Sequence, residues 1–267
     1  MDQFRAVVPR SLVHRAANKL HLPVWHEVQA FVQRAEIRKH PLWTDPPVDA
    51  LGQPLLLIGG MCSTGQLLAP LHDVLLRLNF RCVLAPTGLG LDCSEAIVRR
   101  SESTLLRLVD ATGRPAIIVG HSRGGQIGRV LAARRPDLAG GLITLGSPLT
   151  RQLGVNPWLF AHLSVIAIAG SLGVPGLMRT SCGWGSCCQR FRAELVGALP
   201  EQIPFTSVYS RRDSIVDWRS CLDPAARHRE VDTAHGALLW APESLLALVD
   251  ELVGMLRQPH DKELAAS

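Results

Sequence analysis

The chain has few lysines, few aromatic residues and one tyrosine. Aromatic residues make up 5% of its 267 positions, and of 28 basic residues only Lys19, Lys39 and Lys262 are lysines. Such an arginine excess, with abundant alanine, glycine and leucine, is typical of high-GC bacterial coding. The formal net charge of +5 therefore carries little information about partners. Since the sequence lacks a basic recognition helix and an aromatic-lined strand motif, we expect no nucleic-acid partner.

Other features are also absent. The first residues contain no apolar run followed by a small-residue cleavage site, so we expect a cytoplasmic protein. Seven cysteines are too few for a disulfide scaffold, and their odd number leaves at least one thiol unpaired in a monomer. With 47% hydrophobic and 19% charged residues, the composition excludes a disordered or fibrous chain.

The positive charge is concentrated at the N-terminus. Residues 1–40 hold seven basic and three acidic residues, which gives +4 of the total +5. Residues 13–39 have helix-like apolar spacing broken by Pro23, and a proline-rich stretch follows. We predict that residues 1–53 form a basic helical N-terminal arm and linker. Such an arm would dock on an anionic membrane surface or an acidic partner.

From residue 54 the pattern changes to short apolar runs that alternate with amphipathic helices. The runs are 54–60, 81–85, 115–120, 141–146 and 204–209, and the helices are 67–78, 94–111, 124–135 and 242–256. This alternation predicts an α/β domain over residues 54–257, with a mainly parallel, doubly wound sheet of about six strands, and a C-terminal tail at 258–267. The ligand site is expected at the carboxyl ends of the strands.

The sequence GHSRG at 120–124 fits the G-x-S-x-G pattern of a nucleophile elbow. In that motif a strained turn from a strand to a helix exposes a serine above the sheet. The pentapeptide alone is a common coincidence, but here it follows an apolar strand and opens an amphipathic helix. We therefore predict Ser122 as a nucleophile.

A serine hydroxyl needs a base to remove its proton and an acid to orient that base. In this motif class the acid follows the serine in the chain and precedes the base. Asp213 comes just after the strand that ends near residue 209, so it is the preferred acid. Asp217 is the rival, and Asp232 is less favoured because it should still lie within a strand.

His235 is the preferred base, because it follows another short strand and precedes the last helix. His228, which should precede the final strand, and His121, which belongs to the elbow itself, are the alternatives. The oxyanion of an acyl-transfer reaction also needs donors. We expect these to be the backbone N–H groups of Arg123 and of Met61, which lies in a glycine-rich loop after the first strand.

Residues 153–178 contain no Asp, Glu, Lys or Arg. The densest apolar part is 17 residues long, at the short end for a membrane span, and it interrupts an α/β pattern that resumes near residue 205. We predict instead an apolar helical cap within an insert at 149–203. Such a cap either covers the serine and lines an acyl pocket, or is buried with no substrate preference.

Three cysteines close this insert: Cys182, Cys187 and Cys188. Their spacing is not that of paired C-x-x-C ligands and no histidine lies nearby, so we expect no metal. They would form a local disulfide, pair with Cys221, or serve as small packing residues.

Taken together, the chain resembles the α/β-hydrolase superfamily, and within it the small bacterial serine lipases and esterases. The resemblance covers residues 54–256. It is carried by GHSRGG at 120–125, TLGSP at 144–148, VYSRRDSIV at 208–216 and AHG at 234–236. It implies that Ser122 is the nucleophile, His235 the general base and Asp213 the orienting carboxylate, with Met61 and Arg123 in the oxyanion hole.

The expected activity is hydrolysis of a carboxylic ester with an apolar acyl chain, without cofactor or metal. The partner would be a small-molecule or lipid ester. An acyltransferase that uses the same triad, and a non-catalytic binding protein on this fold, stay open as alternatives.

Overall fold

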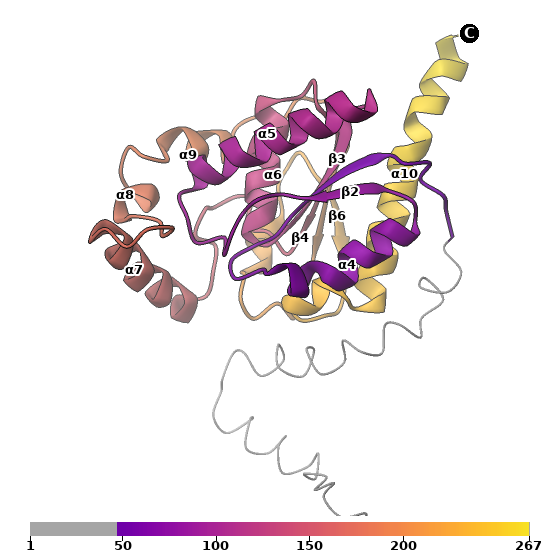
Figure 1. Ribbon diagram of the computed structural model, residues 1–267. Coiled ribbons are helices and arrows are strands. Elements are labelled where there is room, and N and C mark those ends of the chain that lie inside the picture. The colour runs from indigo at the N-terminus through magenta and orange to yellow at the C-terminus, as the bar shows by residue number, and fades with distance from the viewer. Residues whose placement is uncertain (1–46, 267) are drawn as a thin grey trace, which may run out of the picture.

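The computed structural model describes residues 47–266 (Figure 1). Most of the predicted N-terminal arm, residues 1–46, lies outside the described residues, so its helices and its docking role stay predictions. The described part begins in the predicted linker and enters the sheet at Pro54.

Six strands form a single sheet in the order β2-β1-β3-β4-β5-β6, and every neighbouring pair is parallel. This confirms the predicted parallel, doubly wound sheet. The strands are β1 (Pro54–Ile58), β2 (Arg81–Leu84), β3 (Ala116–His121), β4 (Ala139–Leu145), β5 (Phe205–Tyr209) and β6 (Arg227–Glu230). The strand order reverses between β1 and β3, and parallel α/β sheets bind their ligands at such a point.

Helices cover both faces of the sheet (Figure 1). Helices α5 (Ser94–Thr112) and α6 (Arg123–Arg134) pack on one face, and α4 (Gly65–Arg77) and α10 (Pro242–Ala266) pack on the other. Alternate residues of β1 supply the two cores, because successive side chains of a strand lie on opposite faces. Leu55 and Leu57 belong to the core under α4 and α10, while Leu56 and Ile58 belong to the core under α5 and α6.

The predicted insert at 149–203 contains helices α7 (Pro157–Ser171), α8 (Thr180–Gly183) and α9 (Gln189–Leu195). Two short 3₁₀ helices, η2 (Trp218–Cys221) and η3 (Gly236–Leu239), lie in the loops after β5 and β6. Helix α9 joins the core beneath α5 and α6 through Phe191 and Leu195. Helix α7 lies further out, beside α8 (Figure 1).

Two elements differ from the sequence expectations. Helix α10 continues to Ala266, because the residues after Pro259 are good helix formers; it therefore takes in most of the predicted tail. Strand β6 runs over Arg227–Glu230, earlier than expected. All four of its side chains are exposed at the edge of the sheet, so no apolar pattern marked the strand in the sequence.

Candidate active site

Ser122 occupies the turn between β3 and α6 with φ +54° and ψ −126°. A non-glycine residue in this region of φ/ψ space is strained, and such strain is concentrated at functional sites. The turn is possible because its flanking residues are glycines. A Cβ on Gly120 would overlap the backbone of Gly125, and a Cβ on Gly124 would overlap the backbone of Ile58. The local geometry is that of the predicted elbow.

The loop after β1 runs directly over this turn. A Cβ added to Gly60 would lie 2.7 Å from the Cβ of Ser122, so the loop backbone approaches the serine closely. Met61, the next residue, lines the same pocket as Ser122 and Arg123. In the described part of the chain, neither the N–H of Met61 nor that of Arg123 donates a hydrogen bond to another backbone group. For Arg123 this follows from its place in the first turn of α6.

The structure brings His235 and Asp213 together. Nδ1 of His235 lies 2.6 Å from Oδ2 of Asp213. The other oxygen, Oδ1, accepts the backbone N–H groups of Ile215 at 2.9 Å and Val216 at 2.7 Å. The Asp213 side chain is 1% exposed. A buried carboxylate held by three donors has a fixed orientation, so it fixes the imidazole ring as well.

His121 brings this pair to the elbow. Its Nε2 lies 3.1 Å from the backbone oxygen of His235, and the centroids of the two rings are 4.8 Å apart. Burial, with a smaller effect of His235, lowers the pKa of His121 to about 3. The ring is therefore neutral at pH 7 and donates Nε2–H to the carbonyl oxygen. Because His121 directly precedes Ser122 in the chain, this contact ties the loop of His235 to the elbow.

The residues considered as alternatives to Asp213 and His235 bind other partners. Asp217 caps η2 by accepting the N–H of Arg219 and forms an ion pair with Arg151 at 3.4 Å. Nε2 of His228 lies 2.8 Å from the backbone oxygen of Asp223. His228 is part of β6 and does not precede it, which corrects the sequence expectation.

Asp232 also differs from expectation. It follows the end of β6 and is not inside the strand. Its side chain is 68% exposed and pairs with Arg212 at 3.3 Å. Of the acids considered from the sequence, Asp213 is the one that binds His235.

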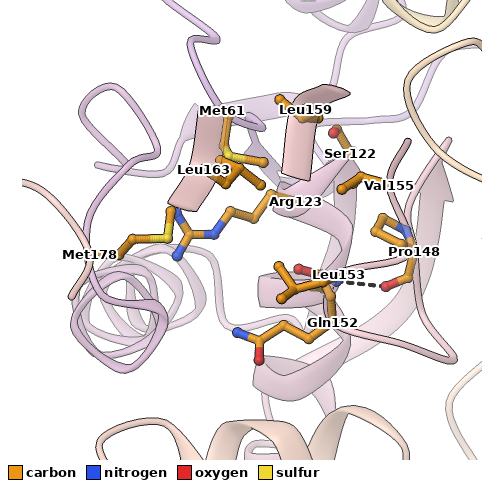
Figure 2. Close-up of a pocket in the computed structure, with 11 residues that line it drawn as sticks. Met61, Ser122, Arg123, Pro148, Gln152, Leu153, Val155, Leu159, Leu163 and Met178 are labelled. Atoms are coloured by element: carbon orange, nitrogen blue, oxygen red, sulfur yellow. Dashed lines mark hydrogen bonds between the residues drawn. The ribbon is translucent and has the colours of Figure 1, made fainter. Parts of the chain in front are cut away.

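A pocket opens next to Ser122 (Figure 2). Its lining is mostly apolar and comes from the loop after β1, the elbow and its helix, the loop after β4 and the cap: Met61, Ser122, Arg123, Gln126, Pro148, Gln152, Leu153, Val155, Leu159, Leu163 and Met178. The last five of these are among the apolar residues of 153–178. The predicted cap thus lines a cavity at the serine.

Two polar side chains of this pocket gave no signal in the sequence. Gln126 of α6 donates from Nε2 to the backbone oxygens of Pro148 at 2.7 Å and Gln152 at 2.9 Å, which ties the start of the cap to the elbow helix. Oε1 of Gln152 is buried without a hydrogen-bond partner in the described residues. Only the fold shows that these residues, 26 positions apart, meet at the pocket.

The side chain of Arg123 has a structural role beside that of its backbone N–H. Its guanidinium is buried and donates to the backbone oxygens of Gly90 and Asp92 and to Oγ of Ser94. These contacts hold the loop before α5 against the elbow. The sequence suggested only the backbone role, since nothing in it connects residue 123 with residues 90–94.

The outer side of the cap is apolar. Exposed large hydrophobic residues gather on α7 and the turn after it: Trp158, Phe160, Val165, Ile168, Leu172 and Val174. Helix α7 has 15 residues. Within residues 47–266, no helix combines the length and the apolar character needed to span a membrane.

No family model matches the sequence, and no curated protein matches it. Solved structures do match the fold. One is a metagenomic carboxyl esterase, at 14% identity and a TM-score of 0.56, covering 79% of this chain and 77% of that one. A soluble variant of monoglyceride lipase from Saccharomyces cerevisiae, with a substrate analogue, matches at 14% identity and a TM-score of 0.54, covering 80% and 88%.

A third match comes from work on LipS and LipT, two metagenome-derived lipolytic enzymes. Its identity is 14%, its TM-score is 0.56, and the match covers 79% of this chain and 96% of that one. At these identities the likeness concerns the fold, and the parallel sheet with helices on both faces is an α/β-hydrolase fold.

Proposed function

We propose that the protein is a serine hydrolase that cleaves carboxylic esters with an apolar acyl chain. The observation that carries this proposal is the 2.6 Å contact between His235 and Asp213, in a pair that His121 joins to the turn of the strained Ser122. A nucleophile, a base and an orienting acid, with the acid between the other two along the chain, are the groups that acyl transfer through serine requires. The esterases and lipases of similar fold support the same reaction class.

In the acylation step, Ser122 Oγ attacks the ester carbonyl carbon while Nε2 of His235 takes the hydroxyl proton. Asp213 holds the imidazole by Nδ1 and stabilises the positive charge that forms on it. The carbonyl oxygen becomes an oxyanion, which the N–H groups of Met61 and Arg123 would stabilise. His235 then gives its proton to the departing alkoxide, and the acyl group remains on Ser122.

In the deacylation step, water attacks the acyl-enzyme with His235 as the base. The second tetrahedral intermediate uses the same N–H donors. Its collapse releases the carboxylic acid, and the proton returns to Ser122. Protein groups supply the nucleophile, the proton transfers and the charge stabilisation in both steps.

The pocket lining supports an apolar acyl chain. Leu153, Val155, Leu159 and Leu163 offer no charged partner to a substrate. Moving apolar surface from water into such a site is favourable by about 25 cal/mol per Å². A hydrocarbon chain next to the carbonyl therefore fits this pocket better than a polar or charged group.

A Ser122→Ala variant tests the proposal. It should lose hydrolysis of a p-nitrophenyl ester, whereas Ser103→Ala, which changes an exposed serine of α5, should keep the wild-type rate. Full activity of Ser122→Ala would overturn the proposal. Circular dichroism of both variants shows whether the fold is retained.

A further inference from the structure

Four cysteines from distant parts of the sequence meet at the base of the cap. Cys93 lies at the N-terminus of α5, Cys182 in α8, and Cys187 and Cys188 just before α9. Their four sulfur atoms all lie within 4.8 Å of one another. All seven cysteines of the chain are free thiols, so the predicted disulfides do not account for this cluster. Cys221 belongs to a separate cluster beside Tyr209.

The sulfur separations match those of one tetrahedral ion. The distance is 3.5 Å from Cys93 to Cys188, 3.6 Å from Cys93 to Cys187, and 3.7 Å from Cys182 to Cys187. Four thiolates around zinc, with Zn–S bonds of about 2.3 Å, have their sulfurs about 3.8 Å apart. A [4Fe–4S] cluster, in which each iron binds one thiolate, would need wider spacing.

We propose that these four residues, called the four-cysteine cluster below, bind one Zn²⁺ in a structural site. Binding forms four Zn–S bonds and releases a proton from each thiol that is still protonated. The four protein ligands leave no open position on the ion, as in structural zinc sites. The site lies apart from Ser122 and is independent of the proposed hydrolase activity.

This proposal departs from the sequence expectation of no metal. That expectation considered the spacing of Cys182, Cys187 and Cys188 along the chain, which provides three ligands at most. The fourth ligand, Cys93, comes from the other side of the elbow in sequence and joins them only in the folded protein.

The surroundings of the four-cysteine cluster suit an anionic metal complex. The buried guanidinium of Arg123 donates to the backbone oxygen of Asp92 and to Oγ of Ser94, on either side of Cys93, so that a positive charge lies near the net negative charge of a Zn²⁺ ion with four thiolates. The backbone N–H of Arg179 donates to Sγ of Cys182 at 3.4 Å. Such donors orient metal ligands.

The four-cysteine cluster is open to solvent on one side. The exposure of Cys187 gives an ion a path to the cluster, while Cys182 and Cys188 are buried.

The proposed ion would join the cap, which lines the pocket, to the segment before α5. Met178, a pocket residue, donates its N–H to the oxygen of Leu91 at 2.6 Å, close to both Cys93 and Cys182 in sequence. The guanidinium of Arg192 donates to the oxygens of Cys182 and Gly185 and holds the ligand loop. A zinc ion would therefore fix the cap to the N-terminus of α5.

The test uses the full chain, purified under reducing conditions and loaded with Zn²⁺ or with Co²⁺. We expect one zinc per chain by elemental analysis. With Co²⁺ we expect the sulfur-to-metal charge-transfer bands and intense d–d bands of a tetrahedral thiolate site. Cys188→Ser should lose both signals, and Cys82→Ser, which changes a thiol on β2 outside the cluster, should keep both.

Wild-type protein alone can overturn the proposal, even if Cys188→Ser fails to fold. Absence of stoichiometric zinc and of the cobalt bands, with the four thiols reduced, would contradict it. Disulfides among these cysteines in protein purified without oxidant would contradict it as well. Loss of the cobalt bands in Cys82→Ser would also contradict the proposal.

Discussion

His121 and His235 contact each other through a ring nitrogen and a backbone oxygen, 3.1 Å apart. The donor ring is neutral, because burial lowers the pKa of His121 to about 3. In an unfolded chain a histidine titrates near 6.5. The unfolded state therefore binds more protons than the folded state between these pH values, and stability falls as the pH is lowered through that window.

We predict that acidification from pH 7 to pH 5 costs about 2 kcal/mol of unfolding free energy through His121 alone. His121→Asn keeps a donor for the carbonyl oxygen of His235 but does not titrate. Urea unfolding of both proteins at the two pH values measures the difference. The variant should lose less stability on acidification than the wild type, and equal losses would contradict this role of His121.

Asp213→Asn should lower kcat by about 10⁴-fold, because an amide that donates to Nδ1 favours the wrong tautomer of His235. The matched control is Asp217→Asn, four residues away, whose carboxylate caps η2. It should change kcat little. The comparison separates the two acids that the sequence left open. A large loss in Asp217→Asn with none in Asp213→Asn would reverse the assignment.

The buried ion pair of Arg129 and Asp223 should be important for stability. Nε of Arg129 lies 2.5 Å from Oδ2 of Asp223, and the side chains are 2% and 5% exposed. Arg129 also donates to the backbone oxygens of Glu194 and Gly197. Arg129→Ala leaves a buried carboxylate unpaired and should cost about 3–5 kcal/mol in urea unfolding.

The control for this prediction is the exposed pair of Arg229 and Asp250, 3.5 Å apart. Arg229→Ala should cost less than about 1 kcal/mol, as expected for a surface ion pair. A similar loss of unfolding free energy in both variants would contradict the prediction that burial makes the Arg129 pair more important for stability.

The apolar pocket should set acyl-chain preference. Leu163 is buried against the pocket, and Leu163→Trp should remove room for part of a long acyl chain. Losing space for two methylenes costs about 1.6 kcal/mol, more than tenfold in kcat/KM. Leu172→Trp, at a position 83% exposed, is the control.

A series of p-nitrophenyl esters of increasing acyl length gives the readout. Leu163→Trp should lose activity on long chains and keep it on the acetyl ester, and Leu172→Trp should match the wild type. An unchanged chain-length profile in Leu163→Trp would contradict the acyl pocket and favour a cap with a purely structural role.

The sequence predicted the sheet well because its central strands are continuous apolar runs, such as 54–58 and 116–119. It also predicted the elbow, because the geometry there demands glycine at positions 120 and 124. Strand β6 was placed wrongly because its exposed residues, RHRE, carry no apolar pattern.

Contacts between residues that are distant in the sequence could not be predicted from the sequence pattern. Cys93 is 94 residues from Cys187, and only the packing of the cap against α5 brings them together. The buried guanidinium of Arg123 is a similar case, since its acceptors lie in a loop about 30 residues upstream. Local periodicity carries no information about such contacts.

The central claim is that Ser122 is the nucleophile, and labelling with a fluorophosphonate followed by peptide mapping tests it most directly. The probe loses fluoride and phosphonylates a serine only where the hydroxyl is activated by a neighbouring base. We predict one adduct per chain, located on Ser122, and no adduct in Ser122→Ala. An adduct on another residue, or equal labelling of Ser122→Ala, would contradict the account.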